Sequence, residues 1–203
     1  MKTVLFIGDS ITDSDRLSDD PASLGAGYVA RVAEWHALEN PGTRVRFLNH
    51  GISGDRIGDL RRRWVIDCLE YKPDVVSIMI GVNDMWRRYD RDDPTRAEDF
   101  AADYRDILAR TVDIGAQPVV VEPFLLPVRE EQWEWRADLD PKIAVARNLA
   151  IEFGALFVAT DGPMAQAGAA GEPTDWAYDG VHPTPAGHAL LARAWLTATR
   201  TIS

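Results

Sequence analysis

Residues 3–10, TVLFIGDS, contain an apolar run that stops abruptly at Asp9 and Ser10. The run TVLFIG has the length and the Val, Ile and Phe content of a buried strand. Asp and Ser after a strand often close a turn or cap a helix, because both side chains bond to nearby backbone N–H groups. The alternative is that the strand delivers Ser10 to a functional site, and the rest of the chain must decide between the two.

Four further segments have the character of a buried strand, being short, rich in Val, Ile and Phe, and bounded by Gly or Pro. They are RVRFLNHG (44–51), DVVSIMIG (74–81), QPVVVEP (117–123) and ALFVAT (155–160). With TVLFIG, the sequence therefore predicts five strands.

Helical patterns separate these strands. In the first two gaps apolar residues recur every three or four positions, which places them on one helix face; they are Tyr28, Val32, Trp35 and Leu38, then Ile57, Leu60, Trp64 and Cys68. Residues 95–114 and 141–153 predict two more helices. A last helix is predicted from Pro185 to Thr199, with Thr184 as N-cap and Pro185 in the first turn.

Alternating strands and helices favour parallel strands joined by right-handed crossovers. We therefore expect an α/β fold, a three-layer α/β/α sandwich with a five-stranded parallel sheet. A length of 203 residues suits one domain spanning residues 1–203.

The composition argues against several classes of partner. The net charge is −10, whereas nucleic acids and anionic lipids are bound through clustered Lys and Arg. The one dense basic run, Arg61-Arg62-Arg63, is interpreted as the solvated face of a helix. We therefore expect no nucleic-acid and no membrane partner.

The location expected for the chain is cytoplasmic. No apolar stretch approaches the roughly 18 to 20 residues of a membrane helix, and VLFI is too short for a signal peptide. Cys68 is the single cysteine, so no internal disulfide is possible, and we expect a buried, inert thiol.

Three positions that are distant in sequence follow strands and should converge. In parallel sheets, ligands bind beyond the carboxyl ends of the strands. Ser10 follows the first strand, Gly54 the second and Asn83 the third. We expect the three to lie on one rim of the sheet.

A base for Ser10 is available in DGVHP (179–183). A serine hydroxyl becomes a good nucleophile when a histidine, oriented by a carboxylate, takes its proton. Asp179 and His182 are three residues apart, so a turn can bring the carboxylate beside the imidazole. Donors for a developing oxyanion would be the backbone N–H groups of Ser10 and Gly54 and the side-chain amide of Asn83.

The blocks GDSIT, NHGISGD, GVND and DGVHP, in this order over residues 8–183, resemble those of the SGNH or GDSL hydrolase superfamily. The resemblance implies a flavodoxin-like sheet and neither metal nor organic cofactor. It also implies catalytic roles for Ser10, Asp179 and His182, with Ser10, Gly54 and Asn83 forming the oxyanion hole.

Longer stretches, among them NHGISGDRIGDLRRRW and KPDVVSIMIGVNDMWRRYD, look like those of bacterial intracellular acetyl xylan esterases of this superfamily. That resemblance implies a homo-oligomeric serine esterase that removes acetyl groups from acetylated carbohydrates such as xylo-oligosaccharides. Its partner would be a small-molecule acyl ester or acetylated oligosaccharide. Tyr178, directly before Asp179, departs from the tryptophan those esterases have there.

Candidate substrate contacts are Asp9, Trp86 and His50. Trp86 would pack on a sugar ring or restrict the acyl pocket, and the alternative is a core tryptophan. His36 and His188 are interpreted as structural or surface residues. The segment 122–140 is predicted to be a long irregular loop that walls the acyl site or forms a subunit contact.

Two other functions remain open from sequence. The same catalytic residues serve lysophospholipases, thioesterases and broad arylesterases, and the fold alone does not choose among them. A non-catalytic carbohydrate-binding protein of the same fold is the third hypothesis, although such a protein would need none of the five catalytic and oxyanion residues.

Overall fold

The computed structural model describes residues 1–200, whose five strands form one parallel sheet in the order β2-β1-β3-β4-β5. The strands are β1 (Lys2–Gly8), β2 (Val45–Gly51), β3 (Val75–Met79), β4 (Gln117–Val121) and β5 (Leu156–Val158). Each lies within or beside a predicted segment. Because every pairing is parallel, all five carboxyl ends lie at the same rim.

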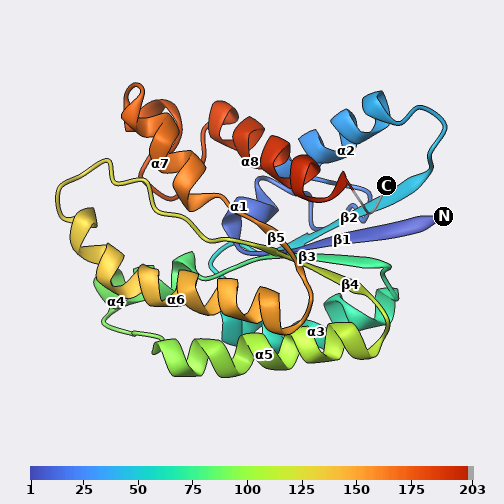
Figure 1. The fold of residues 1–203 in the computed structure, drawn as a ribbon, viewed down its shortest axis with the longest axis horizontal. Coiled ribbons are helices and arrows are strands. Elements are labelled where there is room, and N and C mark those ends of the chain that lie inside the picture. The colour runs from blue at the N-terminus through green and yellow to red at the C-terminus, as the bar shows by residue number, and fades with distance from the viewer. Residues whose placement is uncertain (201–203) are drawn as a thin grey trace.

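Helices cover both faces of the sheet, as Figure 1 shows, with α2, α7 and α8 on one side and α3, α5 and α6 on the other. The helices are α1 (Ser10–Asp13), α2 (Tyr28–Glu39), α3 (Ile57–Asp67), α4 (Val82–Arg91), α5 (Ala97–Asp113), α6 (Gln132–Glu152), α7 (Asp161–Ala169) and α8 (Pro185–Ala198). Two 3₁₀ turns, η1 (Leu69–Tyr71) and η2 (Pro173–Asp175), complete the elements. The predicted three-layer α/β/α sandwich is confirmed.

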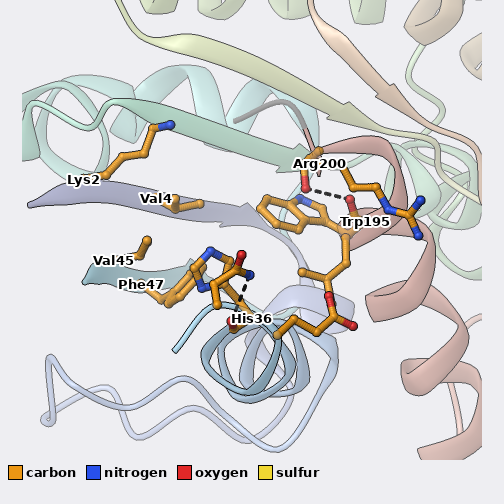
Figure 2. Close-up of a pocket in the computed structure, with 11 residues that line it drawn as sticks. Lys2, Val4, His36, Val45, Phe47, Trp195 and Arg200 are labelled. Carbon is orange, nitrogen blue, oxygen red and sulfur yellow. Dashed lines mark hydrogen bonds between the residues drawn. The ribbon is translucent and has the colours of Figure 1, made fainter. Parts of the chain in front are cut away.

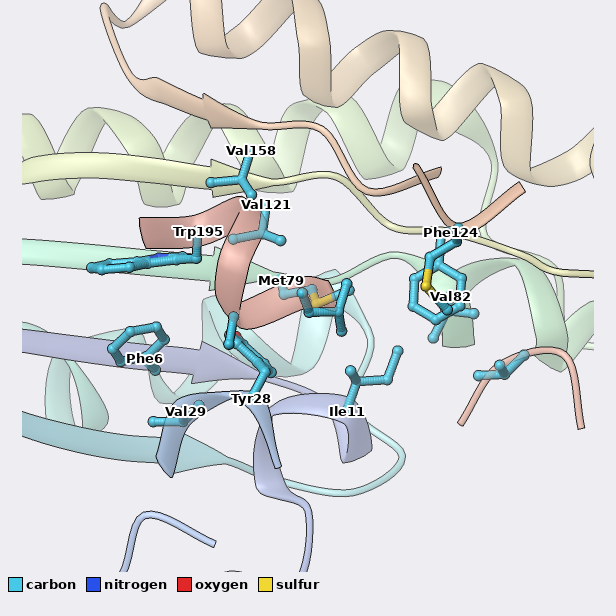
Figure 3. Close-up of a cluster of buried hydrophobic side chains, with 14 of the residues drawn as sticks. Phe6, Ile11, Tyr28, Val29, Met79, Val82, Val121, Phe124, Val158 and Trp195 are labelled. Carbon is cyan, nitrogen blue, oxygen red and sulfur yellow. The ribbon is translucent and has the colours of Figure 1, made fainter. Parts of the chain in front are cut away.

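The two faces of β1 enter different hydrophobic clusters, since successive side chains of a strand point to opposite sides. Val4 and Phe6 face the cluster under α2 and α8, and Leu5 and Ile7 face the cluster under α3 and α5. Figure 3 shows Phe6 beside Trp195, and the two ring centroids lie 5.0 Å apart. Burial on both faces explains why TVLFIG is apolar without alternation.

The last helix begins as the sequence predicts. Thr184 is the N-cap of α8, and its hydroxyl oxygen accepts a hydrogen bond from the Gly187 N–H at 3.2 Å. Pro185 occupies the first turn, where a missing N–H costs nothing. This cap matters for the site because α8 starts directly after the 179–183 segment.

The prediction that residues 122–140 form an irregular loop is wrong for the second half of the segment. Helix α6 begins at Gln132 and continues through Pro141, whereas the sequence pattern predicts a helix only from 141. Proline inside a helix costs about 3 kcal/mol. Burial of Trp135 and Leu139 before it, and of Ile143 after it, offsets that cost.

Two predictions of side-chain direction are also wrong. Leu38, expected on the inner face of α2, is 73% exposed, and His36 is buried instead. Arg63, expected in a solvated basic run, has a side chain only 14% exposed, while Arg61 and Arg62 do face solvent. Cys68 is buried as predicted, and burial raises the pKa of its thiol to about 12.

Within residues 1–200, none of the helices combines the length and the apolar character needed to cross a membrane.

A matched pair of leucines tests the placement of α2 and α3. Leu60→Ala removes a fully buried side chain of α3 and should lower the free energy of unfolding by about 2 to 5 kcal/mol. Leu38→Ala removes an exposed side chain of α2 and should change it by less than about 0.5 kcal/mol. Urea titration followed by circular dichroism measures both, and equal losses would show that Leu38 faces the core.

Candidate active site

Strand β1 ends at the rim and passes directly into the short helix α1, which carries Ser10 in its first position. Asp9 caps this helix, and its Oδ1 accepts a hydrogen bond from the Ile11 N–H at 3.0 Å. Gly8 is required here, because a Cβ would stand 2.2 Å from the carbonyl oxygen of Met79. Close packing between β1 and β3 therefore fixes where the Ser10 hydroxyl emerges.

The 179–183 segment forms a tight turn around the Asp179 carboxylate. Its Oδ1 accepts backbone N–H groups from Val181 at 3.0 Å and His182 at 2.8 Å. Its Oδ2 lies 2.7 Å from Nδ1 of His182. A carboxylate only accepts, so Nδ1 carries the proton and the turn fixes the imidazole tautomer.

The remaining ring nitrogen of His182 reaches across the rim to Ser10. Nε2 lies 3.0 Å from Ser10 Oγ and, without a proton of its own, accepts the hydroxyl hydrogen. Ser10, His182 and Asp179 thus form a continuous hydrogen-bonded chain between residues 172 apart in sequence. The structure brings together the three residues predicted to be catalytic.

The predicted oxyanion donors Ser10, Gly54 and Asn83 follow β1, β2 and β3, whose carboxyl ends lie at the same rim of the sheet. Gly54 has φ of +90°, a conformation that favours glycine, and the space where a Cβ would lie is open. In residues 1–200 the backbone N–H groups of Ser10 and Gly54 have no protein acceptor. Asn83, buried at the start of α4, donates one N–H to the Asp55 carbonyl at 3.0 Å and retains a second.

Arg63 ties two of these loops together, a role that sequence reasoning missed. Its guanidinium donates to the Gly8 carbonyl at 3.2 Å and to the Asp55 carboxylate at 2.8 Å. It also donates to Asp67 at 3.1 Å, one turn along α3. Arg63 therefore links the end of β1 to the loop that carries Gly54.

Gln132 supports the segment that carries His182, and it was also missed. This fully buried residue donates to the Asp179 carbonyl at 2.6 Å, while its side-chain oxygen accepts the Val128 N–H at 2.8 Å. The Leu126 N–H donates to the Gly180 carbonyl at 2.9 Å. Hydrogen bonds from Leu126 and Gln132 thus hold the backbone of the Asp179 turn in place.

Two buried acids flank the site. Burial raises the pKa of Asp9 to about 7, although the hydrogen bond from the Ile11 N–H opposes the shift. The Oδ2 atom of Asp9 has no hydrogen-bond partner within the part of the chain that the structure describes. Burial likewise raises the pKa of Asp84 to about 7, although its Oδ2 accepts the Ile57 N–H at 3.1 Å. Burial therefore favours the uncharged form of both carboxyl groups.

Trp86 is half-buried beside the imidazole, with its ring centroid 5.7 Å from that of His182. The Trp86 ring packs against Trp135, with 6.1 Å between the ring centroids. Trp135 in turn stacks on Tyr89, with 5.1 Å between the ring centroids. Trp86 therefore meets both descriptions drawn from the sequence, since it packs on core residues and also borders the site.

The other three histidines lie outside the hydrogen-bonded chain of Ser10, His182 and Asp179. His50 has Nδ1 2.7 Å from the Asp67 carbonyl and its ring edge-on to Tyr71, so its part in substrate binding stays a prediction. His188 accepts the Tyr28 N–H at 3.1 Å, and burial lowers its pKa to about 4. His36 packs edge-on against Phe47. Burial lowers the pKa of His50 as well.

A cavity of about 260 Å³ lies at the opposite end of the sheet, where β1 and β2 begin (Figure 2). Side chains of α2 and α8, including His36 and Trp195, line it together with Val4 and Phe47. None of the predicted catalytic or oxyanion residues contributes to this cavity.

The family model for the GDSL-like lipase/acylhydrolase family matches residues 6–190, and the chain belongs to this family. Members of this family hydrolyse carboxylic esters. The site geometry fits that reaction, because the Ser10 hydroxyl contacts the His182 imidazole and the imidazole contacts the Asp179 carboxylate.

Among curated proteins, the chain is 36% identical over 201 residues to the acetylxylan esterase of Geobacillus stearothermophilus, covering 95% of this chain and 91% of the relative. Solved structures of that esterase superpose with a TM-score of 0.91, covering 97% of this chain and 93% of the other. They include catalytic mutants in which a serine, an aspartate or a histidine is replaced by alanine.

An alpha/beta hydrolase from the metagenome of Lake Arreo is similar as well. It is 31% identical, has a TM-score of 0.92, and the match covers 100% of this chain and 96% of the other. The two folds therefore superpose over nearly the whole length of both chains.

The pH dependence of activity should report His182. The hydrogen bond to Asp179 raises the pKa of His182 above its ordinary value of 6.5, although burial opposes the shift. A base must be deprotonated, so kcat/KM for 4-nitrophenyl acetate should fall on the acid side with an apparent pKa above about 6.5. The Asp179 carboxylate itself has a pKa lowered to about 2, because its hydrogen bonds to His182 outweigh burial, so it stays charged throughout.

Asp179→Asn should lower the rate and move this acid limb to lower pH, since the imidazolium loses its partner charge. Asp19→Asn, an exposed acid of the 15–26 loop, is the control and should leave the profile unchanged. An acid limb in Asp179→Asn at the position seen in the unsubstituted protein would contradict the assignment to His182.

Proposed function

We propose that the protein is a serine esterase that removes acetyl groups from acetylated carbohydrates, xylo-oligosaccharides being the favoured substrate, through an acetyl-Ser10 intermediate. The observation that carries the proposal is the hydrogen-bonded chain from Ser10 through His182 to Asp179. Such a chain activates a hydroxyl that is otherwise a weak nucleophile.

In the acylation step, Ser10 Oγ attacks the carbonyl carbon of the acetyl ester while His182 Nε2 takes the hydroxyl proton. The carbonyl oxygen becomes an oxyanion that accepts from the N–H groups of Ser10, Gly54 and Asn83. The tetrahedral intermediate then loses the sugar oxygen, which takes the proton from His182 and leaves as a free hydroxyl. Asp179 holds the imidazole and balances its transient positive charge.

In the deacylation step, water replaces the sugar hydroxyl. His182 takes a proton from the water as its oxygen attacks the acetyl carbon, and the same donors hold the second oxyanion. Collapse breaks the bond to Ser10 Oγ, returns the proton to the serine and releases acetate. Each residue ends in its initial protonation state.

The substrate class is proposed from the relatives and from Trp86. The acetylxylan esterase shares 36% identity over nearly the whole chain, which supports an acetylated sugar as substrate. Trp86, beside His182 and backed by Trp135, offers an aromatic face on which the apolar side of a sugar ring packs. A contact between Asp9 and the sugar stays a prediction; the residue is 1% exposed, and its charge raises the pKa of His182.

We also propose a cytoplasmic location and a homo-oligomeric assembly. A single buried cysteine suits a reducing compartment. Trp133 and Tyr178 are exposed by 65% and 64% on elements next to the site, and exposed aromatic residues are enriched in subunit contacts. A sedimentation measurement would distinguish monomer from oligomer.

Acid release from a panel of esters tests the proposal. The purified protein is incubated with acetylated xylo-oligosaccharides, other acetylated sugars, lysophospholipids and nitrophenyl esters from acetyl to decanoyl. Acetylated sugars and the shortest nitrophenyl esters should react fastest. Ser10→Ala should reduce acetate release by roughly 10⁴-fold or more without loss of fold, because the nucleophile is removed.

Ser18→Ala, a substitution of an exposed serine in the 15–26 loop, is the matched control and should retain full activity. A longer acyl optimum would contradict the acetyl assignment and favour a lysophospholipase or thioesterase. Full activity of Ser10→Ala would contradict the mechanism itself.

A further inference from the structure

The carboxamide of Asn83 is held from two sides. Its Oδ1 accepts a hydrogen bond from Arg87 Nη2 at 2.8 Å, and its Nδ2 donates to the Asp55 carbonyl at 3.0 Å. A carboxamide nitrogen carries two hydrogens, so one N–H is left for a ligand. The side chain is 2% exposed, which leaves little freedom for any other arrangement.

We propose that Arg87 is a positioning residue for the oxyanion hole: its guanidinium fixes and polarises the Asn83 carboxamide so that the remaining N–H donates to the oxyanion. The inference rests on the proposed function of Asn83. Without the guanidinium on Oδ1, only the Asp55 carbonyl would distinguish the oxygen of the carboxamide from its nitrogen. A carboxamide turned by half a rotation would present an acceptor to the oxyanion and repel it.

Arg87 is itself held in place. It lies one helical turn after Asn83 in α4, a spacing at which side chains meet. Its Nη1 pairs with Asp90, and its guanidinium carbon lies 5.5 Å from the centre of the Trp86 ring. The side chain is only 15% exposed, so solvent screens its charge less than that of a surface arginine.

The guanidinium acts in the direction that the reaction needs. A hydrogen bond from a charged donor is shorter and stronger than a neutral one, and a donor–acceptor chain polarises each member. The guanidinium draws electron density from the Asn83 nitrogen toward the Asn83 oxygen, and this makes the N–H groups better donors. The Asp55 contact also ties this amide to the loop of Gly54, so two of the three oxyanion donors share one support.

Arg87 also acts on the pKa of His182, and this gives a second measurable effect. The Asp179 hydrogen bond raises the pKa of His182, and burial opposes it; among the other charged groups that act on the imidazole, Asp9 raises the pKa and Arg87 lowers it. Removing the guanidinium should therefore move the acid limb of kcat/KM to higher pH. A substitution that only loosened α4 would have no reason to shift it in that direction.

The test is a double-mutant cycle on 4-nitrophenyl acetate hydrolysis, using Arg87→Met, Asn83→Ala and the double variant. Asn83→Ala should lower kcat by roughly 10²-fold, as loss of one oxyanion donor does. Arg87→Met should lower kcat by roughly 10-fold or more with little change in KM, because misplacement of a donor acts on the transition state. The double variant should be no slower than Asn83→Ala alone, because Arg87 acts through Asn83.

Two further variants keep the result interpretable. Arg88→Met removes the neighbouring arginine, whose side chain is 56% exposed, and should leave kcat unchanged. Arg87→Lys keeps the charge and a single donor, and should recover part of the kcat lost in Arg87→Met. Circular dichroism confirms that each variant is folded, and Arg87→Lys serves in the cycle if Arg87→Met does not fold.

Three outcomes would overturn the inference. A folded Arg87→Met with kcat equal to that of the unsubstituted protein would do so, and so would an equal loss of rate with or without Asn83, since the effect would then not pass through the carboxamide. Full activity of Asn83→Ala would remove the proposed oxyanion role of Asn83 and this inference with it. The first two outcomes leave the proposed function intact.

Discussion

The parallel sheet is the constraint on which the site depends, because it sends the carboxyl ends of all five strands to one rim. Strand β1 pairs with both β2 and β3, and its end is packed so closely that only glycine fits at Gly8. On β2, a Cβ at Gly51 would stand 2.2 Å from the backbone nitrogen of Asp13. Close packing at these two strand ends holds α1, and with it Ser10, at a fixed height above the sheet.

A set of side-chain hydrogen bonds then holds three separate loops together as one site. Arg63 joins the end of β1 to the Gly54 loop. From α4, Asn83 and Asp84 bind the side of that loop where α3 begins, at Asp55 and Ile57, and Gln132 holds the Asp179 turn. These groups are buried or nearly so, where an unmade hydrogen bond costs about 1 to 3 kcal/mol. Loss of one of these hydrogen bonds would therefore displace a donor or the base more readily than it would unfold the sheet.

The residues proposed to do chemistry could be selected from the sequence because few side chains suit each task. A nucleophile, a base, an orienting acid and neutral donors leave a short list, and their order after successive strands places them on one rim. The five strands and the Thr184 cap could be predicted for a similar reason, since apolar runs and N-caps are local signals.

The supporting residues could not be predicted, because their roles depend on partners distant in sequence. Arg63 is buried only because Asp55 and the Gly8 carbonyl lie beside it, and a run of three arginines gives no sign of that. Leu38 fits the helical period of α2, yet the buried face of this helix runs through Tyr28, Val32 and His36 and leaves Leu38 in solvent. Helix α6 passes through Pro141 because tertiary burial outweighs the local penalty.

The central claim is that β1 delivers Ser10 to the rim as a nucleophile activated by His182. Treatment with a fluorophosphonate, followed by peptide mass spectrometry, tests it most directly, because the reagent forms a stable adduct only with an activated hydroxyl. The account predicts one adduct per chain, located on Ser10, with acetate release lost in proportion to labelling and with no adduct in His182→Ala. An adduct on another residue that abolishes activity, or full activity with Ser10 labelled, would contradict it.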